Sequence, residues 1–288
     1  MRTPIVSLGS ATAVALTLAL AAPAAHADKW ERGYNVTGTP SLVVRSDDGS
    51  IHVAPGAAGR VEIGIETRGW RIRPRELEIE ATQTGRTIEL EVRTPRRLFE
   101  FNLSPRWIRI EVRVPPASDL DLHSGDGSIA IESVKGAIKA GTGDGSITVD
   151  ALSGDLRLRT GDGRITGTHL DGRLVASTGD GRIRIDGRFD ALELRSGDGS
   201  VVAEAGAGSK MADDWALTTG DGAMSLAIPR DLAADLDVHT GDGRIDVDMP
   251  VTVEGRFSRS TLRGTLNGGG PLLRVRSGDG SIRIGRSL

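Results

Sequence analysis

The tripeptide Gly-Asp-Gly occurs eight times in this chain of 288 residues, and this repetition is the strongest constraint on its fold. The first five copies lie 18 residues apart, and the later gaps are 23, 21 and 37 residues. Repetition at a short period is typical of proteins in which each repeat packs only against its neighbours. The central residues of the eight copies are Asp126, Asp144, Asp162, Asp180, Asp198, Asp221, Asp242 and Asp279.

The residues on both sides of each tripeptide alternate between apolar and polar. A serine or threonine always precedes the first glycine, and we call the resulting Ser/Thr-Gly-Asp-Gly unit a corner. Apolar residues stand two and four positions before the hydroxyl residue, and recur two and four positions after the second glycine, except at Gly167. Alternation of this kind predicts a half-buried strand on each side of the corner.

A single unit of two short strands cannot bury its own apolar face. Units stacked about 4.8 Å apart would share one continuous core. We therefore expect an all-β fold, a single parallel β-solenoid (β-helix) with 18 residues per coil in its regular part. Its crossovers are expected to be right-handed. The longer gaps near the C-terminus are interpreted as loops inserted at corners.

The sequence divides into three segments. Residues 117–288 carry the regular repeat, whereas residues 28–116 lack the short period but still contain alternating strand-like stretches. A degenerate corner from Ser46 to Ile51 lies in this earlier part. Terminal repeats are often atypical because an open sheet edge must be covered. Residues 28–116 are thus expected to form irregular coils or a β cap of the same domain, and a separate small β domain is the alternative.

Residues 1–27 have the pattern of a secretory signal peptide. Arg2 supplies a positive start, residues 11–22 are apolar, and Ala25-His26-Ala27 is a cleavage site that places the mature start at Asp28. No later apolar run is long enough for an integral membrane segment. The mature chain, which has no cysteine, is expected in the periplasm or outside the cell, including the cell surface.

The charge composition is nearly balanced. The chain has 36 basic and 39 acidic residues, a formal net charge of −3. A protein that binds nucleic acid usually carries a basic excess, so a nucleic-acid partner is not expected. A polymer or glycan of the cell envelope, or a protein, is the expected partner, and the sequence sets no oligomeric state.

The corners and the early strand resemble a known family. The stretch Ser46 to Ile51, the entry Val114-Pro115 and the eight corners are similar to the repeated motifs of the DUF4097-type family, bacterial adhesin-like domains of unknown function. The resemblance covers most of the mature chain. It implies an exported β-solenoid at the cell envelope, and it carries over no catalytic residues.

The corner residues have a structural interpretation. Glycines on both sides of the aspartate would permit positive φ angles and close approach of successive coils. The aspartate would accept hydrogen bonds from nearby amides, as in an Asx-turn. The hydroxyl residue would satisfy backbone groups that leave the strand ladder at the bend.

The same corners allow a functional interpretation. Stacked aspartates would form a column of carboxylates that repel one another by about 1 kcal/mol per neighbouring pair in water. Calcium, which takes oxygen ligands, is one way to relieve this repulsion. Basic residues beside the corners are another, and they form a candidate outward basic face for acidic glycans: Arg159, Arg164, Arg182, Arg195, Arg244 and Arg276.

Two classes of function remain. An exported, non-catalytic binding or structural protein of the cell envelope fits the repeat and the resemblance. A polysaccharide-active β-helix enzyme is the alternative, but its site would need clustered carboxylates in one coil that departs from the repeat. The acids here recur evenly. We therefore expect no enzyme, and we assign no catalytic, cofactor-binding or metal residues.

Removal of metal tests the calcium interpretation. We expect chelation of the purified mature chain to leave its melting temperature nearly unchanged, because glycine backbone contacts can hold the corners without a cation. Thermal melting followed by circular dichroism, with and without a chelator, measures this. A large drop with the chelator would instead support a calcium-stabilised repeat.

Overall fold

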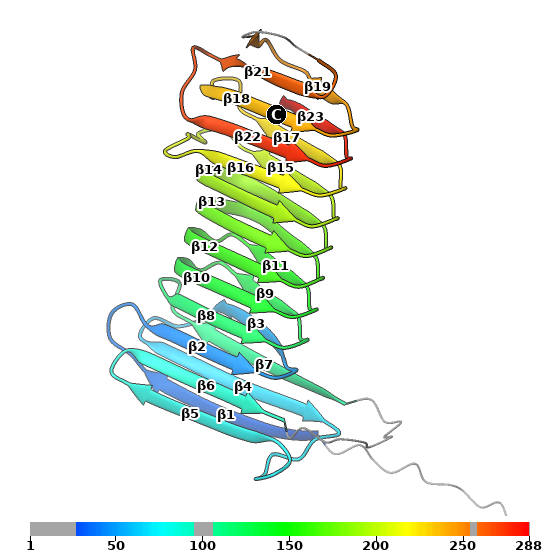
Figure 1. Cartoon of the computed structure of the whole chain (residues 1–288). Coiled ribbons are helices and arrows are strands. Elements are labelled where there is room, and N and C mark those ends of the chain that lie inside the picture. The colour runs from blue at the N-terminus through cyan, green and yellow to red at the C-terminus, as the bar shows by residue number, and fades with distance from the viewer. Residues whose placement is uncertain (1–26, 95–105, 254–257, 288) are drawn as a thin grey trace, which may run out of the picture.

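The chain folds into a tall stack of β-strand coils (Figure 1). The computed structural model describes residues 27–94, 106–253 and 258–287. These described residues form 23 strands and no helix, and hydrogen bonds join all the strands into one mixed sheet. The all-β prediction is therefore confirmed. The predicted signal peptide lies outside the described residues, apart from Ala27.

The strands lie in two layers, which the corners join along one side of the stack (Figure 1). In spatial order the first layer contains β5 (Glu78–Thr84), β6 (Thr87–Arg93), β2 (Ser41–Ser46), β8 (Asp119–Ser124), β10 (Lys135–Thr142), β12 (Ser153–Thr160), the second halves of β13 (Ile165–Thr178) and β14 (Ile183–Ser196), β16 (Trp215–Thr219), β22 (Leu272–Ser277), β18 (Ala234–Thr240), β21 (Thr261–Leu266) and β20 (Thr252–Val253).

The second layer contains the strands that follow each corner and the strands that begin the chain. In spatial order it has β1 (Ala27–Asn35), β4 (Arg60–Arg68), β7 (Trp107–Val114), β3 (Ser50–Pro55), β9 (Ile129–Glu132), β11 (Ile147–Asp150), the first halves of β13 and β14, β15 (Val201–Ala205), β17 (Met224–Ile228), β23 (Ile282–Arg286) and β19 (Ile245–Val247).

The strand directions correct part of the fold prediction. The ladders from β2 and β3 to β18 and β19 are parallel, as predicted. Strands at both ends are antiparallel, namely β1, β4 and β5 at one end and β20 and β21 at the other. A single parallel solenoid thus describes only the middle of the stack. Hairpin-like strands at the ends cover edges that would otherwise be open to pairing. The handedness stays a prediction.

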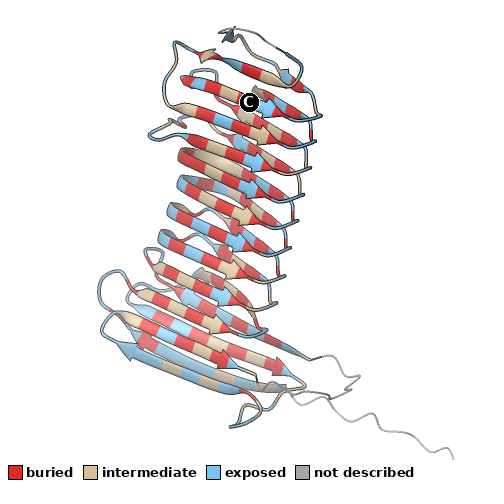
Figure 2. Ribbon diagram, in the orientation of Figure 1, coloured by how far each residue is buried: buried red, intermediate tan, exposed pale blue. Residues whose placement is uncertain are grey.

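The core is a set of apolar columns between the layers. Leu120, Ile138, Leu156 and Leu174 stack in register, and each is at most 2% exposed. Residues on either side of them in each strand are more exposed, which gives the banded pattern of Figure 2. Full burial of one such side chain stabilises the fold by about 1.5–3 kcal/mol. The predicted strand alternation therefore accounts for the core.

The last coil is out of chain order. Strands β22 and β23 lie between the β16–β17 coil and the β18–β19 coil. The chain first forms β18 to β21 and then returns to fill this position. The interpretation of the 37-residue gap as a loop inserted at a corner was therefore wrong, because the gap contains β20 and β21 in addition to the regular β19 and β22, and a change in stacking order.

The corner hydroxyls link each coil to the next. Thr178 Oγ1 donates to the carbonyl oxygens of Gly161 (3.1 Å) and Gly163 (3.0 Å) in the neighbouring coil. The same oxygen accepts a hydrogen bond from the amide of Gly181 in its own corner (3.2 Å). Thr160 repeats this pattern one coil earlier. The prediction that the hydroxyl satisfies backbone groups at the bend is confirmed.

The second glycine of each corner is required by close approach. A Cβ atom on Gly181 would lie 1.9 Å from the carbonyl oxygen of Gly163, and the same distance applies to Gly163 and Gly145. The prediction of positive φ at these glycines was wrong. The left-handed region is used at the opposite turn instead, for example by Gly154 (φ 121°) and Gly172 (φ 119°).

Substitution of a corner glycine should therefore destabilise the stack. We expect Gly181→Ala to lower the free energy of unfolding by about 1–3 kcal/mol, as overpacking does elsewhere. Gly285→Ala is the matched control, because no atom lies within 4 Å of its added Cβ. Urea denaturation compares the two variants, and equal stabilities would contradict the close-approach argument.

Candidate functional site

The eight corner aspartates form one exposed column along the stack. All eight side chains are exposed, and their coils are adjacent in the ladders described above. The inserted coil changes their order, so that Asp279 lies between Asp221 and Asp242. The predicted set is therefore brought together, although not in the order of the chain.

The carboxylates of this column have no protein partner in the described part of the chain. The Asx-turn interpretation was wrong, because the nearby amides already have acceptors. Gly181 N, for example, donates to Thr178 Oγ1, and Gly161 N donates to the Gly143 carbonyl oxygen (2.5 Å). The described residues also contain no group of three or more acidic, histidine or cysteine side chains arranged to hold a metal ion. These carboxylates therefore face water.

The column continues at its N-terminal end into the degenerate corner. Ser46 pairs in register with Ser124, and Ser124 Oγ donates to the carbonyl oxygen of Gly49 (2.8 Å). The pKa of Asp48 is raised above its ordinary value, first by partial burial and then by the negative charges of Asp126 and Asp47. Repulsion from the neighbouring carboxylates therefore contributes to the raised pKa of Asp48 at this corner.

The six predicted arginines do not form one face. Arg159, Arg195 and Arg276 belong to the first layer, whereas the other three follow their corners and begin the second layer: Arg164, Arg182 and Arg244. The aspartate column separates the two groups.

The ion pairs and side-chain hydrogen bonds of these arginines do not involve the aspartate column. Arg195 pairs with Glu193 (2.8 Å), Arg276 pairs with Asp237, and Arg182 donates to Ser200 Oγ (2.9 Å). Across the described ranges, no ion pair joins any of the six arginines to a corner aspartate. The suggested neutralisation of the column by arginine is therefore not seen.

The first layer carries a longer basic surface than the sequence predicted. We call it the cationic stripe and define it as Lys139, Arg157, Arg159, Arg195, Arg274 and Arg276, all on outward positions of β10, β12, β14 and β22. Lys139, Arg157 and Arg274 were missed. Each lies on an outward strand position, so counting every alternate residue would have found them. Only the neighbour of Arg274 could not be read from chain order, because β22 pairs with β16.

A groove of about 450 Å³ lies at one end of the cationic stripe. It opens above Gly141, which has no side chain to fill the surface between β8 and β12. Among the residues that the structure describes, Lys139, Arg157 and Arg159 enter no ion pair, while Arg45 at the rim is held by Asp121 (2.9 Å). The groove therefore presents three unpaired cations to solvent.

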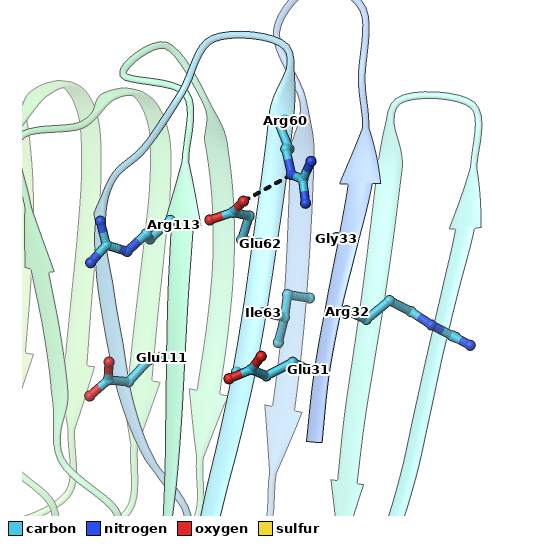
Figure 3. Close-up of a pocket in the computed structure, with 9 residues that line it drawn as sticks. Glu31, Arg32, Gly33, Arg60, Glu62, Ile63, Glu111 and Arg113 are labelled. Carbon is cyan, nitrogen blue, oxygen red and sulfur yellow. Dashed lines mark ion pairs between the residues drawn. The ribbon is translucent and has the colours of Figure 1, made fainter. Parts of the chain in front are cut away.

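A second recess, on the outer face of β1, β4 and β7, is electrically balanced (Figure 3). Gly33 and Gly64 lie among three glutamates and three arginines there. Arg60 pairs with Glu62 (2.9 Å), and Glu31 is held by Lys29 (2.7 Å). This recess of about 380 Å³ has no excess of one charge to select a ligand.

One acid–base pair lies on the second turn of the coils. His169 Nδ1 is 2.8 Å from Asp150 Oδ1, and Thr168 Oγ1 donates to the same carboxylate oxygen (2.5 Å). The hydrogen bond to Asp150 raises the pKa of His169. The side chains of both partners are largely exposed, at 78% and 49%. An exposed pair of this kind gives no enclosed site in which a proton transfer would be favoured.

The architecture defines the class of the protein, an all-β repeat protein of stacked coils that displays charged rows on its outer surface. Its family follows from the sequence: the model of the Toastrack DUF4097 family matches residues 40–285, so the chain belongs to that family. The resemblance seen in the corner motifs is thereby confirmed. No curated protein matches the chain.

Solved structures with a similar course of the chain are distant. A "putative lipid binding protein" from Parabacteroides distasonis is 13% identical, with a TM-score of 0.47, 89% of this chain covered and 96% of that chain. A "putative adhesin" from Bacteroides fragilis is 13% identical, with a TM-score of 0.46 and coverages of 90% and 97%. In the described ranges no helix is long and apolar enough to cross a membrane.

The raised pKa of Asp48 makes a prediction about pH. An acid whose folded pKa is raised destabilises the fold once it ionises, so the penalty is absent in acid and complete at neutral pH. We expect Asp48→Asn to raise the melting temperature slightly at pH 7, with the gain disappearing below the ordinary pKa of 3.8. Asp231→Asn, outside the column, is the charge-matched control. An equal gain at both pH values would contradict this account.

Proposed function

We propose that this protein is an exported, non-catalytic, adhesin-like binding protein of the bacterial cell envelope, and that its cationic stripe binds an anionic envelope polymer. The observation that carries the proposal is the groove above Gly141, where Lys139, Arg157 and Arg159 stand unpaired among the described residues. Because these cations line the same groove, all three can attract one anionic ligand at the same time. The predicted signal peptide supports export, to the periplasm or the cell surface.

For binding an anion, the local positive charge of the cationic stripe matters more than the net charge of the chain. The whole chain is slightly acidic, so it would not attract polyanions from a distance. Added salt screens charges over about 8–10 Å at ordinary ionic strength. A ligand must therefore reach the stripe itself, and its affinity should fall as salt rises. This dependence separates a local basic site from a generally basic surface.

The even distribution of acids supports a binding role over catalysis. The corner aspartates are exposed and repeat from coil to coil, and none of the carboxylates that the structure describes is buried as an enclosed glycoside hydrolysis site would require. A polysaccharide-active enzyme and a calcium-stabilised repeat remain the competing functions. We also propose that residues 28–116 and 117–288 form one domain, supported by the ladders that join β2 to β8 and β3 to β9.

Charge removal at the groove tests the proposal. We expect the triple variant Lys139→Gln, Arg157→Gln, Arg159→Gln to weaken binding of hyaluronan and polygalacturonate about tenfold, at about 0.5 kcal/mol per lost ion pair. Titration calorimetry at low and high salt measures this. The matched control is the second-layer triple variant Arg164→Gln, Arg182→Gln, Arg244→Gln, which removes the same charge.

Two outcomes would overturn the proposal. Equal losses in both triple variants would mean that only total charge matters. Cleavage of either polymer by the wild-type chain, abolished by one acid-to-amide substitution, would show an enzyme instead.

A further inference from the structure

Charged and uncharged residues alternate along one row of the first layer. The row consists of the outward residues that directly precede the corner hydroxyls in five adjacent strands. Strand register aligns them in the order Arg159, Ser177, Arg195, Thr218 and Arg276. An arginine therefore occurs in every second coil, and a small hydroxyl residue lies in each coil between.

The inserted last coil creates this alternation. Strand β22 pairs with β16, so Arg276 is the neighbour of Thr218. If coils stacked in chain order, His239 would occupy that place and the third arginine would be displaced by one coil. Neighbouring strands lie about 4.8 Å apart, so arginines in alternate coils are about 9.6 Å apart along the stack.

A second row repeats this period at its two ends but not in the middle, where Glu193 stands. In the last coil Arg276 is paired with Asp237, and Lys139 lies beside Arg157 in the preceding coil. Two residues before Arg159 and Arg276 lie further arginines, so the first and last charged coils each carry two cations. The intervening coils are again uncharged in this row. The middle coil has one cation beside a glutamate (2.8 Å). The residues of this second row, in spatial order, are Arg157, Val175, Glu193, Ala216 and Arg274.

Carboxylates limit the width of the cationic stripe. On the corner side lie the exposed residues Asp162, Asp198 and Asp279. On the other side lie the exposed residues Asp155 and Asp214, and Arg173 is the neighbour of Asp155 and pairs with it (3.7 Å). A broad anionic surface such as a lipid bilayer would press its charges against the corner aspartates. A single extended polymer chain would touch only the cationic stripe.

We infer that the row of Arg159, Arg195 and Arg276 in the cationic stripe binds a linear polysaccharide that carries one negative charge per disaccharide, laid along the stack and across the strands. The inference rests on the proposed function and specifies its ligand. An extended disaccharide repeat is close to the two-coil distance, so each negative charge would meet one arginine of the first row. The hydroxyls of Ser177 and Thr218 would face the uncharged sugars. A polymer charged on every sugar would place half of its charges beside no cation.

Exchange of two residues tests the spacing without changing the charge. The double variant Ser177→Arg, Arg195→Ser keeps the same side chains but moves one cation by a single coil. The probes are oligosaccharides of hyaluronan, with one carboxylate per disaccharide, and of polygalacturonate, with one per sugar. We expect wild type to prefer hyaluronan, and the exchange to weaken that binding about fivefold while polygalacturonate binding is kept.

A second variant protects the test against a folding defect. Thr218→Arg adds a cation in an uncharged coil and is expected to improve polygalacturonate binding more than hyaluronan binding. Circular dichroism and melting curves check that both variants fold. Equal binding of both probes by wild type, or an exchange variant that binds as wild type does, would overturn the inference alone. Absence of binding to either polymer would overturn both the inference and the proposed function.

Discussion

The structure depends on how closely two coils approach at the corner. A hydroxyl of one coil reaches the glycine carbonyls of the next, and no side chain can stand between them. These hydrogen bonds and the close backbone contact hold successive coils in one relative position. All residues at equivalent positions then line up, in the core and on the surface. The apolar columns and the charged rows are two consequences of the same alignment.

Much of the fold follows from local pattern, because the corner and its flanking alternation repeat. The apolar positions beside each corner are buried, and the hydroxyls make the expected backbone contacts. The antiparallel ends could not be predicted in this way, since residues 28–116 carry no period that specifies their partners. The position of β22 between β16 and β18 could not be predicted either. Both a looped-out insertion and a displaced coil are compatible with a gap of 37 residues.

The candidate site shows the same division. The aspartates were found because the motif marks them, and their exposure follows from their place at the bend. The six arginines were identified by nearness to the motif, which grouped residues from two layers. To assign each arginine to its layer, one must know that the chain passes from the first layer to the second at every corner. Lys139 and Arg157 belong to the groove through strand pairing, which is a property of the stack rather than of one repeat.

The displaced last coil has a consequence for how the molecule is completed. Strands β18 to β21 are made before the coil that separates them from β16. A nascent chain can therefore add coils in order only up to β17, after which a place must stay open until β22 and β23 are made. Strands β22 and β23 then close the core and bring Arg276 beside Thr218. The row of charges across this part of the stack therefore exists only after β22 and β23 have taken their place.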